Sequence, residues 1–199
     1  MPVIASAGQY ERSVDMCELK ELALRNIGRN VVNFQKIEGM LKLLLSQSNF
    51  QSPISKFSET LEERKKIIEK KSLGKLAKEH FKSFGKSMEH IHEYPENRDE
   101  PWISLSFKID NEDGYLPEQK RAFTFLVSER NRLIHQMLVK FDPDSVESCK
   151  TLILELDKQN EMIQREYKNI QVMLKSFYEA RKKLFKESIS EPDNSNSNG

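Results

Sequence analysis

The segment Ser128–Met137, SERNRLIHQM, places polar groups that can do chemistry inside an otherwise apolar helical pattern. It follows FTFLV directly and contains an arginine, an asparagine and a histidine, namely Arg130, Asn131 and His135. Histidine exchanges protons near neutral pH, whereas arginine carries a permanent charge and several hydrogen-bond donors. This segment is therefore the first candidate for a functional site.

A helical projection at about 100° per residue places Arg130 within the apolar stripe of its helix. The stripe consists of Phe123, Leu126, Val127, Leu133, Ile134 and Met137. An arginine in this position must be paired, or must face a partner or ligand, because an unpaired buried charge is costly. Asn131 and His135 share a flanking face with Ser128, whereas Arg130 and His135 are expected about 140° apart around the helix.

A charged residue also interrupts the apolar stripe of the first predicted helix, where Glu38 falls among Phe34, Leu41 and Leu45. We hypothesise that Glu38 meets Arg130, or that both border one polar pocket together with Ser128. The alternative is that Arg130 is a surface arginine whose stem covers apolar area, and that His135 is structural or incidental.

The elements that must position these residues are predicted to be helical. Periodic apolar positions indicate helices over residues 13–48, 58–72, 72–84, 116–138 and 145–186. Residues 85–115 are an irregular excursion in which WISLSFKI alternates like a short strand, with a small β-hairpin as one reading. The prediction is one all-α domain over residues 13–186, an antiparallel up-and-down bundle, with an N-terminal arm (1–12) and a disordered C-terminal tail (187–199).

Charge, cysteine content and the absence of targeting patterns limit the cofactors and the cellular compartment that we expect. The net charge is +1, and the two cysteines form no CxxC or Cys/His cluster, so neither a disulfide framework nor a structural zinc site is expected. The pair His90 and His92 has too few further donors for a metal site, so we expect no metal and no cofactor. No signal peptide or membrane span is evident, and a cytoplasmic protein without a membrane partner is expected.

Basic residues are concentrated in residues 56–86, which hold ten Lys and Arg against five Asp and Glu, and again in residues 181–186. Such clusters are either an electrostatic footprint for RNA or solvated helix faces with compensating glutamates. The residues taken as candidate RNA contacts are Arg132, Lys65, Lys66, Lys70 and Lys71.

The run Arg130-Asn131-Arg132-Leu133-Ile134-His135 resembles the signature of the HEPN superfamily, an arginine followed by a polar residue and, a few residues later, a histidine on a late helix. The helix order is similar as well. The resemblance implies a HEPN-type bundle and a metal-independent endoribonuclease that works as a homodimer in toxin–antitoxin or antiphage defence. His135 would be the general acid or base and Arg130 would stabilise charge on the phosphate. Asn131 would orient the histidine or hold a phosphate oxygen, and cleavage would leave a 2′,3′-cyclic phosphate.

One position departs from a subgroup of HEPN toxins, in which a tyrosine two residues after the histidine is modified by a partner nucleotidyltransferase. Met137 stands there in this chain. Neutralisation by that route is not expected, although an antitoxin or another regulatory protein remains a predicted partner. The rival reading is a non-catalytic HEPN-like binding or scaffold module in which Arg130 is a structural ion-pair partner of Glu38.

Overall fold

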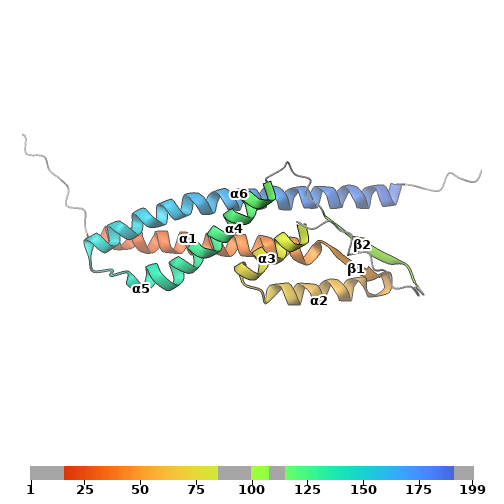
Figure 1. The fold of residues 1–199 in the computed structure, drawn as a ribbon, viewed down its shortest axis with the longest axis horizontal. Coiled ribbons are helices and arrows are strands. Elements are labelled where there is room, and N and C mark those ends of the chain that lie inside the picture. Colours follow the sequence, from red (N-terminus) through yellow and green to blue (C-terminus); the bar gives the residue numbers. More distant parts are fainter. Residues whose placement is uncertain (1–15, 85–99, 108–114, 191–199) are drawn as a thin grey trace, which may run out of the picture.

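The computed structural model describes residues 16–84, 100–107 and 115–190 as a helical bundle with a small sheet (Figure 1). In chain order the elements are α1 (Met16–Gln47), β1 (Phe50–Pro53), η1 (Ile54–Lys56), α2 (Phe57–Glu69), α3 (Leu73–Phe84), β2 (Trp102–Leu105), α4 (Tyr115–Arg132), η3 (Leu133–Met137), α5 (Leu138–Lys140) and α6 (Val146–Ser190). The predicted all-α class is confirmed. None of the described helices combines the length and apolarity needed to cross a membrane.

Successive helices reverse direction, as predicted for an up-and-down bundle, but the two longest helices run parallel to each other (Figure 1). Lys20 near the start of α1 pairs with Asp144 just before α6, at 3.1 Å, and Gln47 at the end of α1 bonds to Arg181 far along α6. The reason is topological. Three helical passes, α2, α3 and α4 with α5, separate α1 from α6, so the first and last passes point the same way.

Buried amide side chains fix the register of α1 against α6. Asn30 is fully buried and donates through Nδ2 to the Leu156 carbonyl at 2.8 Å and to Gln159 Oε1 at 3.1 Å. One turn further, Asn33 Nδ2 donates to Asn160 Oδ1 at 3.2 Å. Buried polar groups are costly unless they are hydrogen-bonded, so sliding α1 along α6 would break these bonds.

The apolar core lies on both sides of this polar seam and is shared by α1, α3, α4 and α6. Its fully buried large side chains include Ile37, Leu41, Leu44, Leu45, Leu76, Phe123, Leu126, Leu133, Leu156, Ile163 and Ile170. The core positions of α4 recur at helical spacing, as the sequence predicted. They hold the predicted motif helix against α3 on one flank and α6 on the other.

The strand predicted in WISLSFKI is confirmed as β2, but its partner does not lie in residues 85–115. β2 pairs antiparallel with β1, directly after α1, in the register Phe50↔Leu105. Asn49 precedes β1 with a φ of 52°, a conformation that asparagine tolerates, and its Oδ1 accepts the Phe107 N–H at 2.7 Å. The hairpin reading is therefore wrong for the described strands, because the pairing is long-range.

Several predicted boundaries differ or lie beyond the described ranges. α6 extends through Ser190, so the first four residues of the predicted tail 187–199 are helical. The predicted arm 1–12, the remainder of that tail, and most of the excursion, including His90 and His92, lie outside the described residues.

Candidate functional site

The three motif residues lie where α4 passes into η3, and they differ in exposure. Asn131 and His135 are exposed on the outer face of this helix, with Ser128 one turn earlier, whereas Arg130 is half-buried. The Arg130 guanidinium donates to Asn131 Oδ1 at 3.2 Å. Ser128 bonds within its own helix, its Oγ donating to the Phe125 carbonyl at 2.7 Å. Arginine, asparagine and histidine thus present donors and a titratable group at one place on the surface.

His135 stands in a π-helical turn rather than in a regular α-helix. Within η3 the Leu138 N–H bonds to the Leu133 carbonyl, five residues back instead of four. Residues in such a turn advance by a smaller angle per step, so Arg130 and His135 lie closer in direction than the 140° expected for an α-helix. The widened turn therefore reduces the separation that a regular α-helix would give the two groups. Single π turns occur frequently at functional sites.

A buried glutamine of α6 provides a physical reason for the widened turn. Gln159 Nε2 donates to the carbonyl oxygen of Glu129 at 3.1 Å and to its Oε2 at 3.0 Å. In a regular α-helix that carbonyl would accept the N–H of Leu133, the first residue of η3. A side chain that enters the backbone ladder in this way distorts the helix beside it. Gln159 also accepts from Asn30, so the seam between α1 and α6 reaches the motif helix.

Arg132, a predicted RNA contact, is instead held by carboxylates. Its guanidinium bonds to Glu129 at 3.0 Å and to Glu155 of α6 at 3.1 Å. The hydrogen bond to Glu129, ahead of the one to Glu155, raises the pKa of Arg132. Through Glu155, Arg132 attaches α4 to α6. Its contact with RNA stays a prediction.

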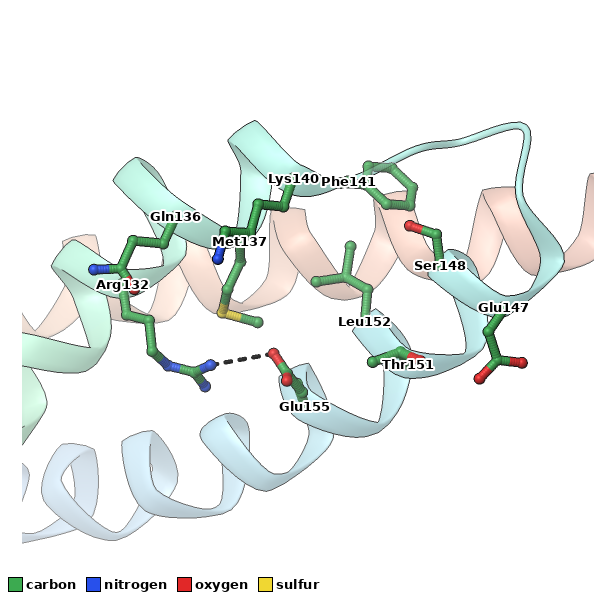
Figure 2. A pocket seen from close by; sticks show the side chains of 10 residues that line it. All are labelled: Arg132, Gln136, Met137, Lys140, Phe141, Glu147, Ser148, Thr151, Leu152 and Glu155. Atoms are coloured by element: carbon green, nitrogen blue, oxygen red, sulfur yellow. Dashed lines mark hydrogen bonds and ion pairs between the residues drawn. The ribbon is translucent and has the colours of Figure 1, made fainter.

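The Arg132–Glu155 pair borders a cavity of about 330 Å³ between the end of α4 and the start of α6 (Figure 2). We call it the α4–α6 cavity. Its lining includes two cations, Arg132 and Lys140, and two anions, Glu147 and Glu155. The motif residues Arg130, Asn131 and His135 are absent from this lining, so the cavity adjoins the motif without containing it.

Glu38 has a role that sequence reasoning did not predict. One carboxylate oxygen pairs with Lys42 at 2.8 Å and the other accepts the backbone N–H of Leu73 at 3.0 Å. A carboxylate at a helix N-terminus satisfies a free N–H and complements the helix dipole. Glu38 therefore anchors the start of α3. The predicted pairing of Glu38 with Arg130 is absent from the ion pairs of the described residues. The rival reading, a non-catalytic binding or scaffold module, stays a prediction without that ion pair.

The lysines predicted to contact RNA lie on α2 and in the turn after it: Lys65, Lys66, Lys70 and Lys71. Lys71 is ion-paired with Glu79 of α3. Lys65 borders a different groove, between α1 and α2, which also contains Glu62 and Glu69. Figure 1 shows α2 away from the η3 end of α4. The structure does not bring these lysines together with the motif.

A different set of lysines lies beside the motif helix. A groove of about 630 Å³ runs between α3 and α4, and we call it the α3–α4 groove. Its charged lining consists of Lys75, Lys78, Lys82 and Lys120. The spacing of the first three on one helical face was a usable signal, because residues three and four apart lie side by side. Lys120 could not be added from sequence, since it depends on how α4 packs.

The residues that the structure describes contain no group of three or more His, Cys, Asp or Glu side chains placed to hold a metal ion. Comparisons of the chain with protein-family models, with curated proteins and with solved structures found no match. The candidate site therefore has to be judged on its own geometry.

Proposed function

We propose that this protein is a metal-independent endoribonuclease of HEPN type that acts as a homodimer in a toxin or antiphage role. The observation that carries the proposal is the placement of Arg130 and Asn131 at the end of α4, next to a π turn that holds exposed His135. A titratable imidazole, a guanidinium and an amide at one surface are the groups that phosphodiester transfer requires.

In the proposed reaction His135 takes the proton from a ribose 2′-hydroxyl. The 2′-oxygen forms a new bond to phosphorus while the bond from phosphorus to the 5′-oxygen breaks, and a protonated imidazole gives a proton to that leaving oxygen. Arg130 stabilises the charge that builds on the non-bridging oxygens, and Asn131 holds Arg130 or a phosphate oxygen in place. The products are a 2′,3′-cyclic phosphate and a 5′-hydroxyl.

The exposure of the site supports the homodimer part of the proposal. The motif residues are absent from the lining of five cavities between the described elements, and a single exposed helix face does not shield a substrate from water. Two copies facing each other through α4 would create a cleft with two histidines, one for each proton transfer. Phe125 and Val139, 55% and 77% exposed on the same helical rod, offer apolar area for such a contact.

The test is cleavage of total RNA by purified protein in the presence of EDTA, with wild type, His135→Ala and the matched variant Gln136→Ala. General acid–base groups contribute roughly 10²- to 10⁴-fold, so we expect His135→Ala to lose at least about 100-fold while Gln136→Ala keeps activity. Product ends should carry cyclic phosphate. Equal activity of wild type and His135→Ala, or strict dependence on a divalent metal, would contradict the proposal.

A further inference from the structure

The lysines of the α3–α4 groove have no counter-charge in its lining. All four, Lys75, Lys78, Lys82 and Lys120, are exposed, and no acidic residue contributes to the groove. None of them is ion-paired to another residue within the described ranges. Clustered lysines without compensating carboxylates repel one another, and an anionic partner relieves that repulsion.

We propose that the α3–α4 groove binds single-stranded RNA and leads the strand to the motif. This inference rests on the proposed function and adds to it the place where the substrate is held. The lysines contact consecutive phosphates along the strand, and the floor of the groove receives unpaired bases.

The groove ends at the motif. Val127 of α4 lies against the start of α3, and a Cβ added at Gly74 would be 3.4 Å from the Val127 side chain. Asn131 is four residues beyond Val127, so about 6 Å along the helix axis separates the end of the groove from the first motif residues. A strand in the groove therefore reaches Arg130 and Asn131 without crossing another element.

The floor of the groove suits bases rather than a second layer of charge. It is formed by Ala77, Phe81, Phe123 and Val127. Phe81 is half-buried, and its ring meets that of Phe123 edge to face with centroids 5.4 Å apart, which fixes its position. A fixed aromatic ring beside lysines is the arrangement by which proteins bind single strands without base specificity. The bases of a duplex are stacked and paired, and cannot reach such a floor.

Glu38, whose carboxylate lies at the start of α3, is already engaged. Glu38 accepts from the first N–H of α3 and pairs with Lys42. Its charge is thereby offset, and the four groove lysines determine the local potential.

The experiment measures binding separately from cleavage. Full-length protein carrying His135→Ala is titrated into a fluorescent 12-nucleotide single-stranded RNA, and anisotropy gives Kd at several salt concentrations. The groove variant adds Lys75→Gln, Lys78→Gln and Lys82→Gln, and the matched control adds Lys65→Gln, Lys66→Gln and Lys70→Gln on α2. We expect the groove variant to bind at least about tenfold more weakly and its log Kd against log salt slope to fall by about 2, with the control unchanged.

Equal weakening of the groove variant and the control would overturn the inference, because it would mean that only total charge matters. It would also be overturned by tighter binding of an RNA duplex, of poly-glutamate or of anionic vesicles to the same groove. The two proposals fail separately. Loss of binding in the groove variant, with wild type inert toward RNA, removes the proposed cleavage and keeps the binding site. Normal cleavage by a protein that carries the three groove substitutions but keeps His135 removes the proposed binding site and keeps the proposed cleavage.

Discussion

The two flanks of α4 differ in how their charges are satisfied. On the flank toward α6, the α4–α6 cavity has two cations and two anions, and Arg132 bonds to Glu129 and Glu155 (Figure 2). On the flank toward α3, the groove has four lysines and no acidic residue. Charges that are paired inside the molecule serve its assembly, whereas charges left without partners there are available to an external ligand. The motif residues lie between these two flanks.

The largest effect is expected on the flank toward α6, from Gln159→Leu. This substitution removes the amide that links Asn30 and Glu129, so that Asn30 loses one of its two acceptors and the Glu129 carbonyl loses a donor. Unfolding free energy should fall by about 3 kcal/mol in urea titrations. Exposed Gln171, also on α6, provides the control Gln171→Leu, which should change stability by less than about 0.5 kcal/mol. If both variants unfold alike, the polar network does not secure this flank.

The flank toward α3 should respond to pH through His80, which is buried beneath the groove and stacks on Phe123 with centroids 5.6 Å apart. Burial lowers the pKa of His80 from 6.5 to about 4. The unfolded chain therefore binds more protons between these values, and stability decreases as pH falls from 6.5 toward 4. At pH 5 this costs about 2 kcal/mol relative to pH 7.

Replacing His80 by Phe keeps an aromatic ring against Phe123 and removes the titration. Urea unfolding of wild type and His80→Phe at pH 7 and pH 5 isolates the effect, since the other titrating groups are common to both. We expect the variant to lose about 2 kcal/mol less than wild type on acidification. An identical pH dependence would show that His80 is not held neutral.

Two lysines of the motif helix and its extension compare the flanks directly. Lys120 lines the α3–α4 groove and Lys140 lines the α4–α6 cavity, and both are exposed. At about 0.1 M salt, Lys120→Gln should weaken binding of single-stranded RNA about fivefold, as expected for one lost phosphate contact. Lys140→Gln should leave Kd unchanged in the same anisotropy assay. If Lys140→Gln weakened RNA binding and Lys120→Gln did not, the RNA would be bound at the α4–α6 cavity instead of the α3–α4 groove.

The smallest effect is expected from Glu155→Gln. Glu155 and Arg132 have side chains that are 44% and 35% exposed, and Arg132 retains Glu129 as a partner. Exposed ion pairs contribute little, so unfolding free energy should change by less than about 1 kcal/mol in thermal or urea denaturation. A larger loss would mean that this pair, rather than Gln159, connects α4 to α6.

The helices could be predicted from the sequence because they depend on local periodicity. The first helix, expected over 13–48, is observed over Met16–Gln47. The motif helix likewise begins at Tyr115, one residue before its predicted start. Both helices carry apolar residues that recur every three to four positions. This pattern indicates a helix with one buried face, and it does not depend on which elements cover that face.

The remaining features depend on contacts between residues far apart in the chain. Gln159, which bonds to the helix just before the π turn, is thirty residues from Glu129, and the β1–β2 pairing joins Phe50 to Leu105. One partner of Glu38, Lys42, stands four residues later, but the other is the backbone N–H of Leu73, which carries no sequence signal. The projection placed Arg130 correctly near the apolar stripe, but it could not show that a widened turn changes its relation to His135.

The parallel course of α1 and α6 has a practical consequence for labelling the protein. Helix α1 begins at Met16, close to the Lys20–Asp144 contact. Helix α6 leads away from that contact for 45 residues, about 68 Å, and ends at Ser190 (Figure 1). A label attached at Met16 and a label attached at Ser190 therefore lie at opposite ends of the rod. A direct connection from Ser190 to Met16 would have to span this length, which takes about 20 fully extended residues.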